Sequence, residues 1–386
     1  MCDGRGGGPF FIFDKTDLQE EYHGQSFSIS SYSEFMVHNA QLKNGTNMPH
    51  IKNEIWFGLA GTIDTLPSNG FDIQTIISYS DQGFFNGVQK WGNTLLTRYG
   101  KTTARRESDY TINYLNYWTD NGAYYYYNSE SSDYEDTMIN VANQDIPYKS
   151  WQFDSWWYYK DDNGAVLNWT AMPSAFPNGI QPVFQTTSIP LVAQNRWWSS
   201  QTNYALANGG DYIFEIDSTT STAVPVEAKF WNDLFHNSTN WGLIGYEQDW
   251  LNIQTDNMGS FGTNVTMARD WLLQMGQGAE NFDISIMYST AWPRHMLQSV
   301  QIPTVTSIRV SNDYQPGNYQ WDIGVSSIYS YALGLSPFKD VFWTTTIQPG
   351  NEKYGNNTEY RTTLQSVIAT LSTGIVGIGD KSLKYL

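Results

Sequence analysis

The sequence predicts an α/β protein in which an all-β region precedes a (β/α)8 barrel. Beyond about Arg105, short apolar runs alternate with helical patterns, which is the order of parallel βαβ units, and eight such units close into a barrel. Before Arg105 the chain has short alternating strands separated by turn residues. The 386 residues are 40% hydrophobic and 15% charged, as is ordinary for a globular fold. We therefore divide the chain into a β-rich region, 1–105, and a barrel, 106–386.

The β-rich region is predicted from alternating apolar residues between turn signals. Lys43-Asn44-Gly45 and Ser68-Asn69-Gly70 are such signals. Further along, the apolar spacing becomes helical, and the helix Gly87–Tyr99 leads into the barrel. The expected strands are Pro9–Phe13, Phe27–Val37, Ile55–Ala60 and Asp72–Tyr79.

The barrel is predicted to contain eight strands with helices between them. The helix Asp133–Asn143 has an acidic first turn, which favours a helix N-terminus. Other expected helices are Pro225–Ser238, Met267–Met275 and Tyr360–Ser372. The expected strands, in chain order, are Tyr114–Tyr127, Tyr148–Tyr158, Leu191–Trp198, Trp241–Asp249, Asp283–Tyr288, Val305–Val310, Asp340–Thr344 and Gly374–Gly379.

Three aspartates follow apolar runs and stand beside aromatic residues. Asp249 precedes Trp250, Asp313 precedes Tyr314, and Asp154 lies among tryptophans. Carboxylates at the C-terminal ends of parallel strands meet at the mouth of a barrel, where such enzymes place their chemistry. A flanking ring partly desolvates an acid, which raises its pKa and suits a proton donor. The pattern therefore indicates a site that cleaves glycosidic bonds with paired acids. The alternative is that each aspartate caps the helix after its strand.

Composition restricts the ligand. Aromatic residues make up 16% of the chain, with 16 Trp and 26 Tyr, and such rings either stack on sugars or fill a core. The net charge of −17 argues against nucleic acid and against an anionic membrane surface, so a neutral carbohydrate is the expected partner. No apolar run is long enough to predict a membrane-spanning helix.

Cofactors are not expected. Cys2 is the only cysteine, so no internal disulfide or cysteine metal cluster is possible. The five histidines include no His-x-x-x-His pair, which argues against a catalytic metal. His295 could line the site near the fifth strand, and a core or surface histidine is the alternative.

Five Asn-x-Ser/Thr sequons are compatible with a glycosylated protein that is secreted or resides in a lysosome-like compartment. The start of the chain, Met1-Cys2-Asp3-Gly4-Arg5, lacks the charged and then apolar pattern of a signal peptide. We therefore expect either a cytosolic protein or a chain that begins inside a longer precursor. The sequons are at Asn44, Asn168, Asn237, Asn264 and Asn356.

Three motifs lie near the ends of predicted barrel strands. They are Tyr246-Glu247-Gln248-Asp249, Met287-Tyr288-Ser289 and Ile308-Arg309-Val310-Ser311-Asn312-Asp313-Tyr314. These motifs resemble those of the α-galactosidase and raffinose synthase group of glycoside hydrolases, which belongs to clan D. The resemblance covers about residues 110 to 386, and the front region looks like the end of the β-sandwich domain that precedes such barrels. It implies a strand-four aspartate nucleophile, Asp249, and an acid/base after strand six, Asp313.

The resemblance also implies sugar-binding residues. Asp154 matches the strand-two acid that grips the hydroxyls of the terminal sugar, and Phe176-Pro177-Asn178-Gly179 resembles the loop that follows. Arg309 would contact a sugar hydroxyl beside the acid/base. The full expected binding set is Asp154, Trp156, Trp157, Arg196, Trp197, Glu247, Tyr288 and Arg309.

One position departs from the group. Its members carry a lysine two residues before the nucleophile, where this chain has Glu247. A carboxylate accepts hydrogen bonds where an ammonium donates them, so a galactose substrate is in question. Arg196, in the segment Asn195-Arg196-Trp197-Trp198, could supply a replacement cation. Glu247 could instead pair with Arg196 or Arg309 and only position that side chain.

Three functions fit these observations. The first is a retaining, exo-acting α-glycosidase, and the second is a transglycosylase of the raffinose synthase type. The third is a carbohydrate-binding barrel without catalysis, since a fold does not guarantee activity. The presence of both Asp249 and Asp313 argues for the enzymes.

Overall fold

The computed structural model describes residues 3–4, 6–13, 24–43, 54–121, 134–318, 320–348 and 357–381 of the chain. Residues 122–127 of the first predicted strand, Asp133 at the start of a predicted helix, and the sequons at Asn44 and Asn356 lie outside these residues. The boundary predicted near Arg105 lies in the short helix α2 (Ala104–Glu107).

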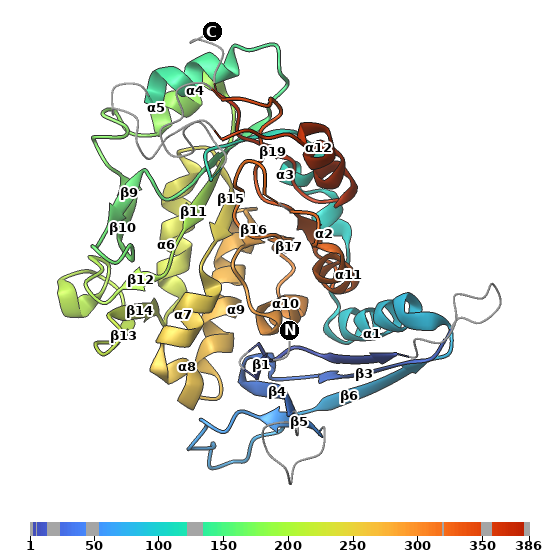
Figure 1. Cartoon of the computed structure of the whole chain (residues 1–386). Coiled ribbons are helices and arrows are strands. Elements are labelled where there is room, and N and C mark those ends of the chain that lie inside the picture. The colour runs from blue at the N-terminus through green and yellow to red at the C-terminus, as the bar shows by residue number, and fades with distance from the viewer. Residues whose placement is uncertain are drawn as a thin grey trace.

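Eight parallel strands form the central sheet, and the predicted α/β barrel class is confirmed (Figure 1). The strands are β7 (Asn116–Trp118), β8 (Ser150–Phe153), β11 (Leu191–Asn195), β15 (Leu243–Gln248), β16 (Ser285–Tyr288), β17 (Val305–Arg309), β18 (Ser336–Phe338) and β19 (Gly377–Ile378). Their spatial order is β18-β17-β16-β15-β11-β8-β7-β19. The two edges of the sheet meet at a parallel bridge between Phe342, shortly after β18, and Ile378.

Helices pack around this sheet (Figure 1). In α6 (Ala228–Thr239), Phe230, Trp231, Leu234 and Phe235 are buried, because residues three and four apart share one face of a helix. This face packs against α9 (Met267–Asn281) at Gly278, where a Cβ atom would lie 2.7 Å from the Cβ of Trp231. The other helices of the barrel are α3 (Tyr110–Asn113), α4 (Tyr134–Ala142), α5 (Gln181–Thr187), α7 (Leu251–Asn257), α8 (Gly259–Thr263), α10 (Pro293–Gln298), α11 (Gly324–Ala332) and α12 (Thr362–Leu371).

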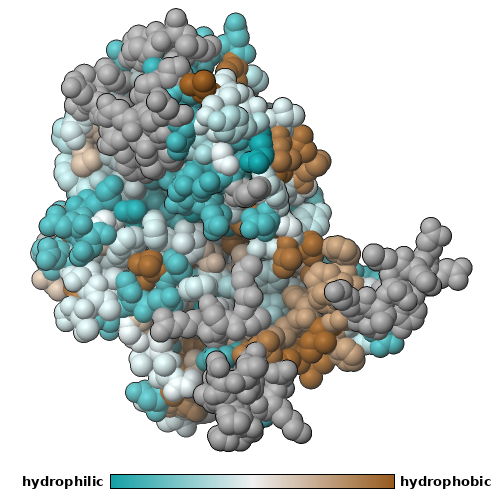
Figure 2. Space-filling model, in the orientation of Figure 1, coloured by the Kyte–Doolittle hydropathy of each residue, from teal (hydrophilic) through white to brown (hydrophobic). Residues whose placement is uncertain are grey.

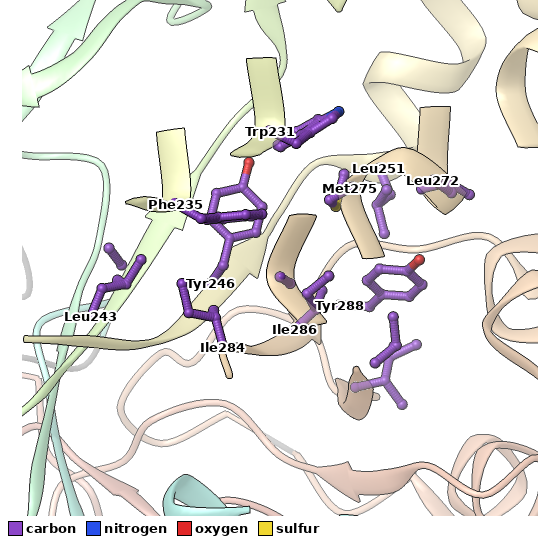
Figure 3. Close-up of a cluster of buried hydrophobic side chains, with 14 of the residues drawn as sticks. Trp231, Phe235, Leu243, Tyr246, Leu251, Leu272, Met275, Ile284, Ile286 and Tyr288 are labelled. Atoms are coloured by element: carbon purple, nitrogen blue, oxygen red, sulfur yellow. The ribbon is translucent and has the colours of Figure 1, made fainter. Parts of the chain in front are cut away.

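Aromatic rings fill the core between α6, α9 and the central strands. Trp231 and Phe235 stack with ring centroids 5.8 Å apart, and both meet the ring of Tyr246 edge-on. Figure 3 shows these rings beside Ile286 and Tyr288 of β16. Many of the aromatic residues are therefore packing residues rather than sugar platforms.

Before the barrel, the described residues form two three-stranded antiparallel sheets. The first contains β1 (Asp3–Gly4), β4 (His38–Lys43) and β5 (Glu54–Leu59), and the second contains β2 (Phe10–Phe13), β3 (Ser26–Ser31) and β6 (Thr75–Ser80). The helix α1 (Gly83–Tyr99) follows, as predicted. The single strand predicted at Phe27–Val37 is wrong, because Glu34 has a φ of 51° and the chain turns there before β4.

A five-stranded side sheet is absent from the prediction. It joins β9 (Tyr158–Lys160), β10 (Val166–Ala171), β12 (Trp198–Ser199), β13 (Phe214–Asp217) and β14 (Thr222–Pro225). The predicted strands Tyr148–Tyr158 and Leu191–Trp198 each contain a whole barrel strand, β8 or β11, and the first residue of a strand of this side sheet. The predicted helix start at Pro225 is the end of β14 instead.

The seventh barrel strand differs from the prediction. It is Ser336–Phe338, whereas Asp340–Thr344 was expected. Sequence patterns do not predict a strand here, because Pro337 and the preceding Gly334 are of residue types that are rare inside strands. The shift places Asp340 after the strand end rather than at its start.

The outer surface has an apolar groove of about 600 Å³ between α1, α11 and α12. Its lining includes Phe85, Tyr331, Val367 and Leu371, and Figure 2 shows hydrophobic residues gathered over these helices. None of the described residues that line this groove is acidic, so the carboxylates described below lie elsewhere. Among the described residues, no helix has the length and hydropathy required to cross a bilayer.

Candidate active site

The candidate site lies where the barrel strands end. Asp120 follows β7, Asp154 follows β8, Asp249 follows β15, Asp313 follows β17 and Asp340 follows β18. The strands are parallel, so these residues lie on the same end of the barrel, which is the end that carries active sites in this architecture.

Asp249 is buried and held by three hydrogen bonds. Its Oδ1 accepts from the Thr290 hydroxyl at 2.7 Å and from the backbone N–H of Trp250 at 2.8 Å. Its Oδ2 accepts from the Gln194 amide at 2.9 Å. The Gln194 side chain is itself oriented by the Tyr158 hydroxyl, which donates to Oε1 at 2.6 Å. The carboxylate of Asp249 is therefore fixed in direction, as a nucleophile requires.

The Arg309 guanidinium lies among several carboxyl groups at the mouth of the barrel. Its Nη2 lies 2.9 Å from Asp313, and its Nη1 lies 3.5 Å from Asp120 and 3.4 Å from Asp340. Burial alone would lower the pKa of Arg309, but the carboxylates around it, Asp340 and Asp249 foremost, raise that pKa well above its ordinary value. The arginine therefore stays charged and links the ends of three strands.

Thr290 connects Arg309 to Asp249. The Arg309 Nη2 lies 3.4 Å from the Thr290 hydroxyl oxygen, which donates to Asp249 at 2.7 Å. The carboxyls of Asp249 and Asp313 are therefore no farther apart than three consecutive polar contacts. This upper bound admits both the spacing of retaining glycosidases, about 5 to 5.5 Å, and that of inverting ones, about 6.5 to 9.5 Å.

Asp313 is more exposed than expected. Its side chain is 54% exposed, and the ring of Tyr314 does not cover it but is buried against Trp343. The Tyr314 hydroxyl donates to Glu359 at 2.9 Å. The prediction that Tyr314 desolvates Asp313 is therefore wrong, and the ion-pair partner of Asp313 is Arg309.

Asp120 and Asp340 form a buried pair whose pKa values are shifted in opposite directions. Burial and the nearby charges of Asp340 and Asp154 raise the pKa of Asp120 well above its usual range. Burial would also raise the pKa of Asp340, but Arg309 and the hydrogen bond with Asp120 lower it overall. The surroundings therefore favour the protonated form of Asp120 and the ionised form of Asp340. The Asp340 Oδ2 also accepts from the backbone N–H of Tyr314 at 2.7 Å, which ties the Asp313 loop to β18.

Glu247 lies inside the barrel, two residues before Asp249. Its Oε2 accepts from the Gln152 amide at 2.8 Å, and the same amide nitrogen lies 3.4 Å from Asp154. Burial, followed by the charges of Asp249 and Asp154, raises the pKa of Glu247 well above its usual range. Burial likewise raises the pKa of Asp154, to about 6. Burial therefore favours the protonated form of Glu247, which can donate as well as accept a hydrogen bond. This revises the sequence-based view of an acceptor alone.

The described residues contain no ion pair between Glu247 and either Arg196 or Arg309. Instead, Arg196 lies over the rings of Trp197 and Trp250, with distances of 5.3 and 5.2 Å to their centroids. These half-buried rings are 5.6 Å apart, and Trp250 directly follows Asp249. The structure thus brings Arg196 and Trp197 to the side of the nucleophile.

The remaining predicted binding residues divide into two groups. The Trp156 ring stacks on Tyr134, and its indole N–H donates at 2.9 Å to Thr119, which also accepts from the backbone N–H of Asp154. Trp156 is therefore close to the acids. Trp157 and Tyr288 are completely buried in the core, and Figure 3 shows Tyr288 among aliphatic side chains. Both rings pack in the hydrophobic core, and their contact with a sugar stays a prediction.

His295 is a structural residue. It is completely buried, accepts from the backbone N–H of Trp292 at the start of α10, and contacts Thr255 at 2.8 Å. Burial lowers its pKa to about 3, so it stays neutral. The alternative of a core histidine is thus correct.

Four residues of the site were not predicted as functional: Gln194, Thr290, Asp120 and Asp340. Gln194 and Thr290 have polar side chains inside or directly after buried strands, which is a usable signal. Asp120 was placed near the end of the first strand without a role. Asp340 was missed because the seventh strand was displaced.

No protein-family model matches the sequence, and no curated protein matches it. Solved structures match its fold. A variant of the family 36 (GH36) α-galactosidase of Geobacillus stearothermophilus, in complex with stachyose, has a TM-score of 0.56 and 11% identity, over 98% of this chain and 56% of its own. The α-galactosidase of Thermus thermophilus, also with stachyose, has a TM-score of 0.57 and 10% identity, over 94% and 74%.

An α-N-acetylgalactosaminidase of Bifidobacterium bifidum has a TM-score of 0.54 and 7% identity, over 95% of this chain and 68% of its own. The chain spans about half the length of several matching structures. At these identities the similarity shows the fold alone. The chain therefore shares with these glycosidases an α/β barrel behind an N-terminal β region.

Proposed function

We propose that the chain is a retaining, exo-acting α-glycoside hydrolase with Asp249 as nucleophile and Asp313 as acid/base. One observation carries this proposal. A buried carboxylate held by three donors lies on the same end of the barrel as an exposed carboxyl, and Thr290 and Arg309 link the two. This arrangement combines a fixed nucleophile with a proton carrier that reaches solvent.

In the first step, an oxygen of Asp249 attacks the anomeric carbon while the bond to the leaving oxygen breaks and Asp313 supplies a proton to that oxygen. In the second step, Asp313 takes a proton from water, and the resulting hydroxide oxygen displaces Asp249 from the sugar. Arg309 keeps its ion pair with Asp340 when Asp313 is neutral, so its charge stays compensated through the cycle.

The substrate we propose is a neutral oligosaccharide or glycoconjugate with an α-linked terminal sugar. Glu247 and Asp154 would meet its hydroxyls, because both acids are buried beside Asp249. A transglycosylase of the raffinose synthase type would use the same two steps with a sugar acceptor in place of water.

The test is a panel of nitrophenyl α-glycosides together with natural oligosaccharides that include stachyose. We expect release of a terminal sugar that retains the α configuration. Proton NMR of the first product measures this configuration. Inverted product would reject the mechanism. No turnover of any member, with sugar binding intact, would favour a carbohydrate-binding barrel.

A further inference from the structure

We propose that Thr290 is a positioning residue that fixes the Asp249 carboxylate and couples it to Arg309. This inference rests on the proposed function, since it assigns a role within the same site. Thr290 directly follows the Met287-Tyr288-Ser289 segment, which contains the end of β16, so it comes from a different strand than either Asp249 or Arg309.

The Thr290 hydroxyl forms a directional pair of hydrogen bonds. A hydroxyl has one proton, and here that proton goes to Asp249 Oδ1 at 2.7 Å. The oxygen lone pairs face Arg309 Nη2 at 3.4 Å. The hydroxyl dipole is thus aligned from the guanidinium toward the carboxylate. A change in the position or charge of one of these groups therefore affects the other.

The backbone holds Thr290 in place as well. Its carbonyl accepts from the N–H of Asn252 at 3.0 Å, and the N–H of Ser289 donates to the carbonyl of Gln248 at 3.0 Å. The segment after β16 is therefore tied to the segment after β15 on both sides of Asp249. The two loops keep a fixed spacing.

Both loops contain a strained residue. Thr290 has a φ of 47° and Trp250 has a φ of 55°, in the left-handed region that β-branched and bulky residues avoid. Such conformations cost about 1–3 kcal/mol and persist where the surrounding structure holds them. A glycine or asparagine would adopt this conformation more easily, so the threonine at this position points to a use for its hydroxyl.

The matched variants are Thr290→Val and Thr290→Ser. Valine keeps the β-branch and the strain but has no hydroxyl, while serine keeps the hydroxyl and loses the branch. Thr373 provides a control, since it also has a positive φ, 67°, and lies exposed after α12. Thr373→Val and Thr373→Ser report the effect of the same changes at a strained threonine outside the site.

The measurements are kcat and KM on an activated aryl α-glycoside, with crystal structures of both Thr290 variants. We expect Thr290→Val to lower kcat by about tenfold to a hundredfold with little change in KM, as for a misplaced reacting group. Thr290→Ser should recover most of the lost rate. Both Thr373 variants should match the wild type. Equal kcat values for Thr290→Val and wild type would overturn the inference.

The crystal structures separate this inference from the proposed function. If the wild type hydrolyses no glycoside, the proposed function fails, and the geometry then decides the role of Thr290. A carboxylate of Asp249 that turns away from its wild-type orientation in Thr290→Val, and not in Thr290→Ser, supports positioning. An unchanged Asp249 and an unchanged Arg309–Asp313 pair in Thr290→Val would overturn it.

Discussion

At the scale of single residues, one arginine contacts several acids whose side chains differ in exposure. Arg309 contacts Asp313 at the surface and the buried pair Asp120 and Asp340. Glu247 and Asp154 lie deeper and are held by the Gln152 amide instead. Burial raises the pKa of Glu247 and of Asp154, and it raises the pKa of Asp120 in spite of the contact with Arg309.

Replacing Asp313 should affect substrates according to their leaving groups. An acid/base donates a proton to a poor leaving group, so Asp313→Ala should slow natural oligosaccharides by about 10²–10⁴-fold and activated aryl glycosides much less. Steady-state kinetics on both classes provide the measurement. Equal slowing of both classes would require another proton donor.

Glu247 should determine which sugar is preferred. Because its acid form is favoured, Glu247→Gln should keep the wild-type order of sugars, whereas Glu247→Lys should change it. A buried side chain that loses its hydrogen bond to a sugar hydroxyl costs about 1–3 kcal/mol of binding free energy. This cost gives roughly ten- to a hundredfold discrimination between sugars. We expect simple α-galactosides to be poor substrates of the wild type. The same order of preference in both variants would remove this role from Glu247.

Asp154 should make stability depend on pH. Its pKa is raised to about 6 in the folded chain, so between about pH 4 and pH 6 the folded state binds more protons than the unfolded state, and stability falls as pH rises. At pH 7, the penalty is on the order of 2–3 kcal/mol. Urea unfolding of wild type and Asp154→Asn from pH 4 to pH 7 should show the variant gaining relative stability across this window. A constant difference would contradict the raised pKa.

At the scale of elements, helix packing depends on small residues at defined points. A Cβ at Gly278 of α9 would lie 2.7 Å from the Cβ of Trp231 in α6. Gly278→Ala should therefore destabilise the fold by about 1–3 kcal/mol, because α6 and α9 must separate. Gly324 of α11 has no atom within 4 Å of an added Cβ, so Gly324→Ala is the control and should be neutral or stabilising. Equal denaturation midpoints for the two variants would refute this view of the α6–α9 contact.

The loops after the strands define the site more than the strands do. Asp249, Thr290 and Asp313 each lie just beyond a strand end, and the two loops after β15 and β16 are joined by backbone hydrogen bonds. The side sheet also contributes, since the Tyr158 hydroxyl orients Gln194 and through it Asp249. Elements outside the barrel thus hold groups inside its mouth.

At the scale of the whole molecule, the barrel could be predicted because buried parallel strands produce short apolar runs between helices. The ends of the strands could be predicted where an acid interrupts such a run, as at Asp154, Asp249 and Asp313. Two kinds of feature could not. The side sheet continues directly from barrel strands, so no composition change separates them, and β18 contains Pro337, which sequence patterns assign to turns.

Contacts between distant segments were also beyond the sequence. The link from Arg309 through Thr290 to Asp249 joins three strands, and spacing along the chain does not specify it. The sequence also could not predict which individual rings are buried, because Trp157 and Tyr288 have the same flanking pattern as residues near the acids. Motif position predicted which strands carry the site, and packing decided which side chains reach it.

The most direct test of the central claim is covalent trapping of the nucleophile. The wild-type chain is incubated with a panel of 5-fluoro-α-glycosyl fluorides, which slow release of the sugar from the enzyme, and the labelled peptide is sequenced by mass spectrometry. We expect a single sugar adduct on Asp249, and none on Asp249→Asn. Turnover of α-glycosides without an adduct at Asp249, or with the adduct on another carboxylate, would contradict the account.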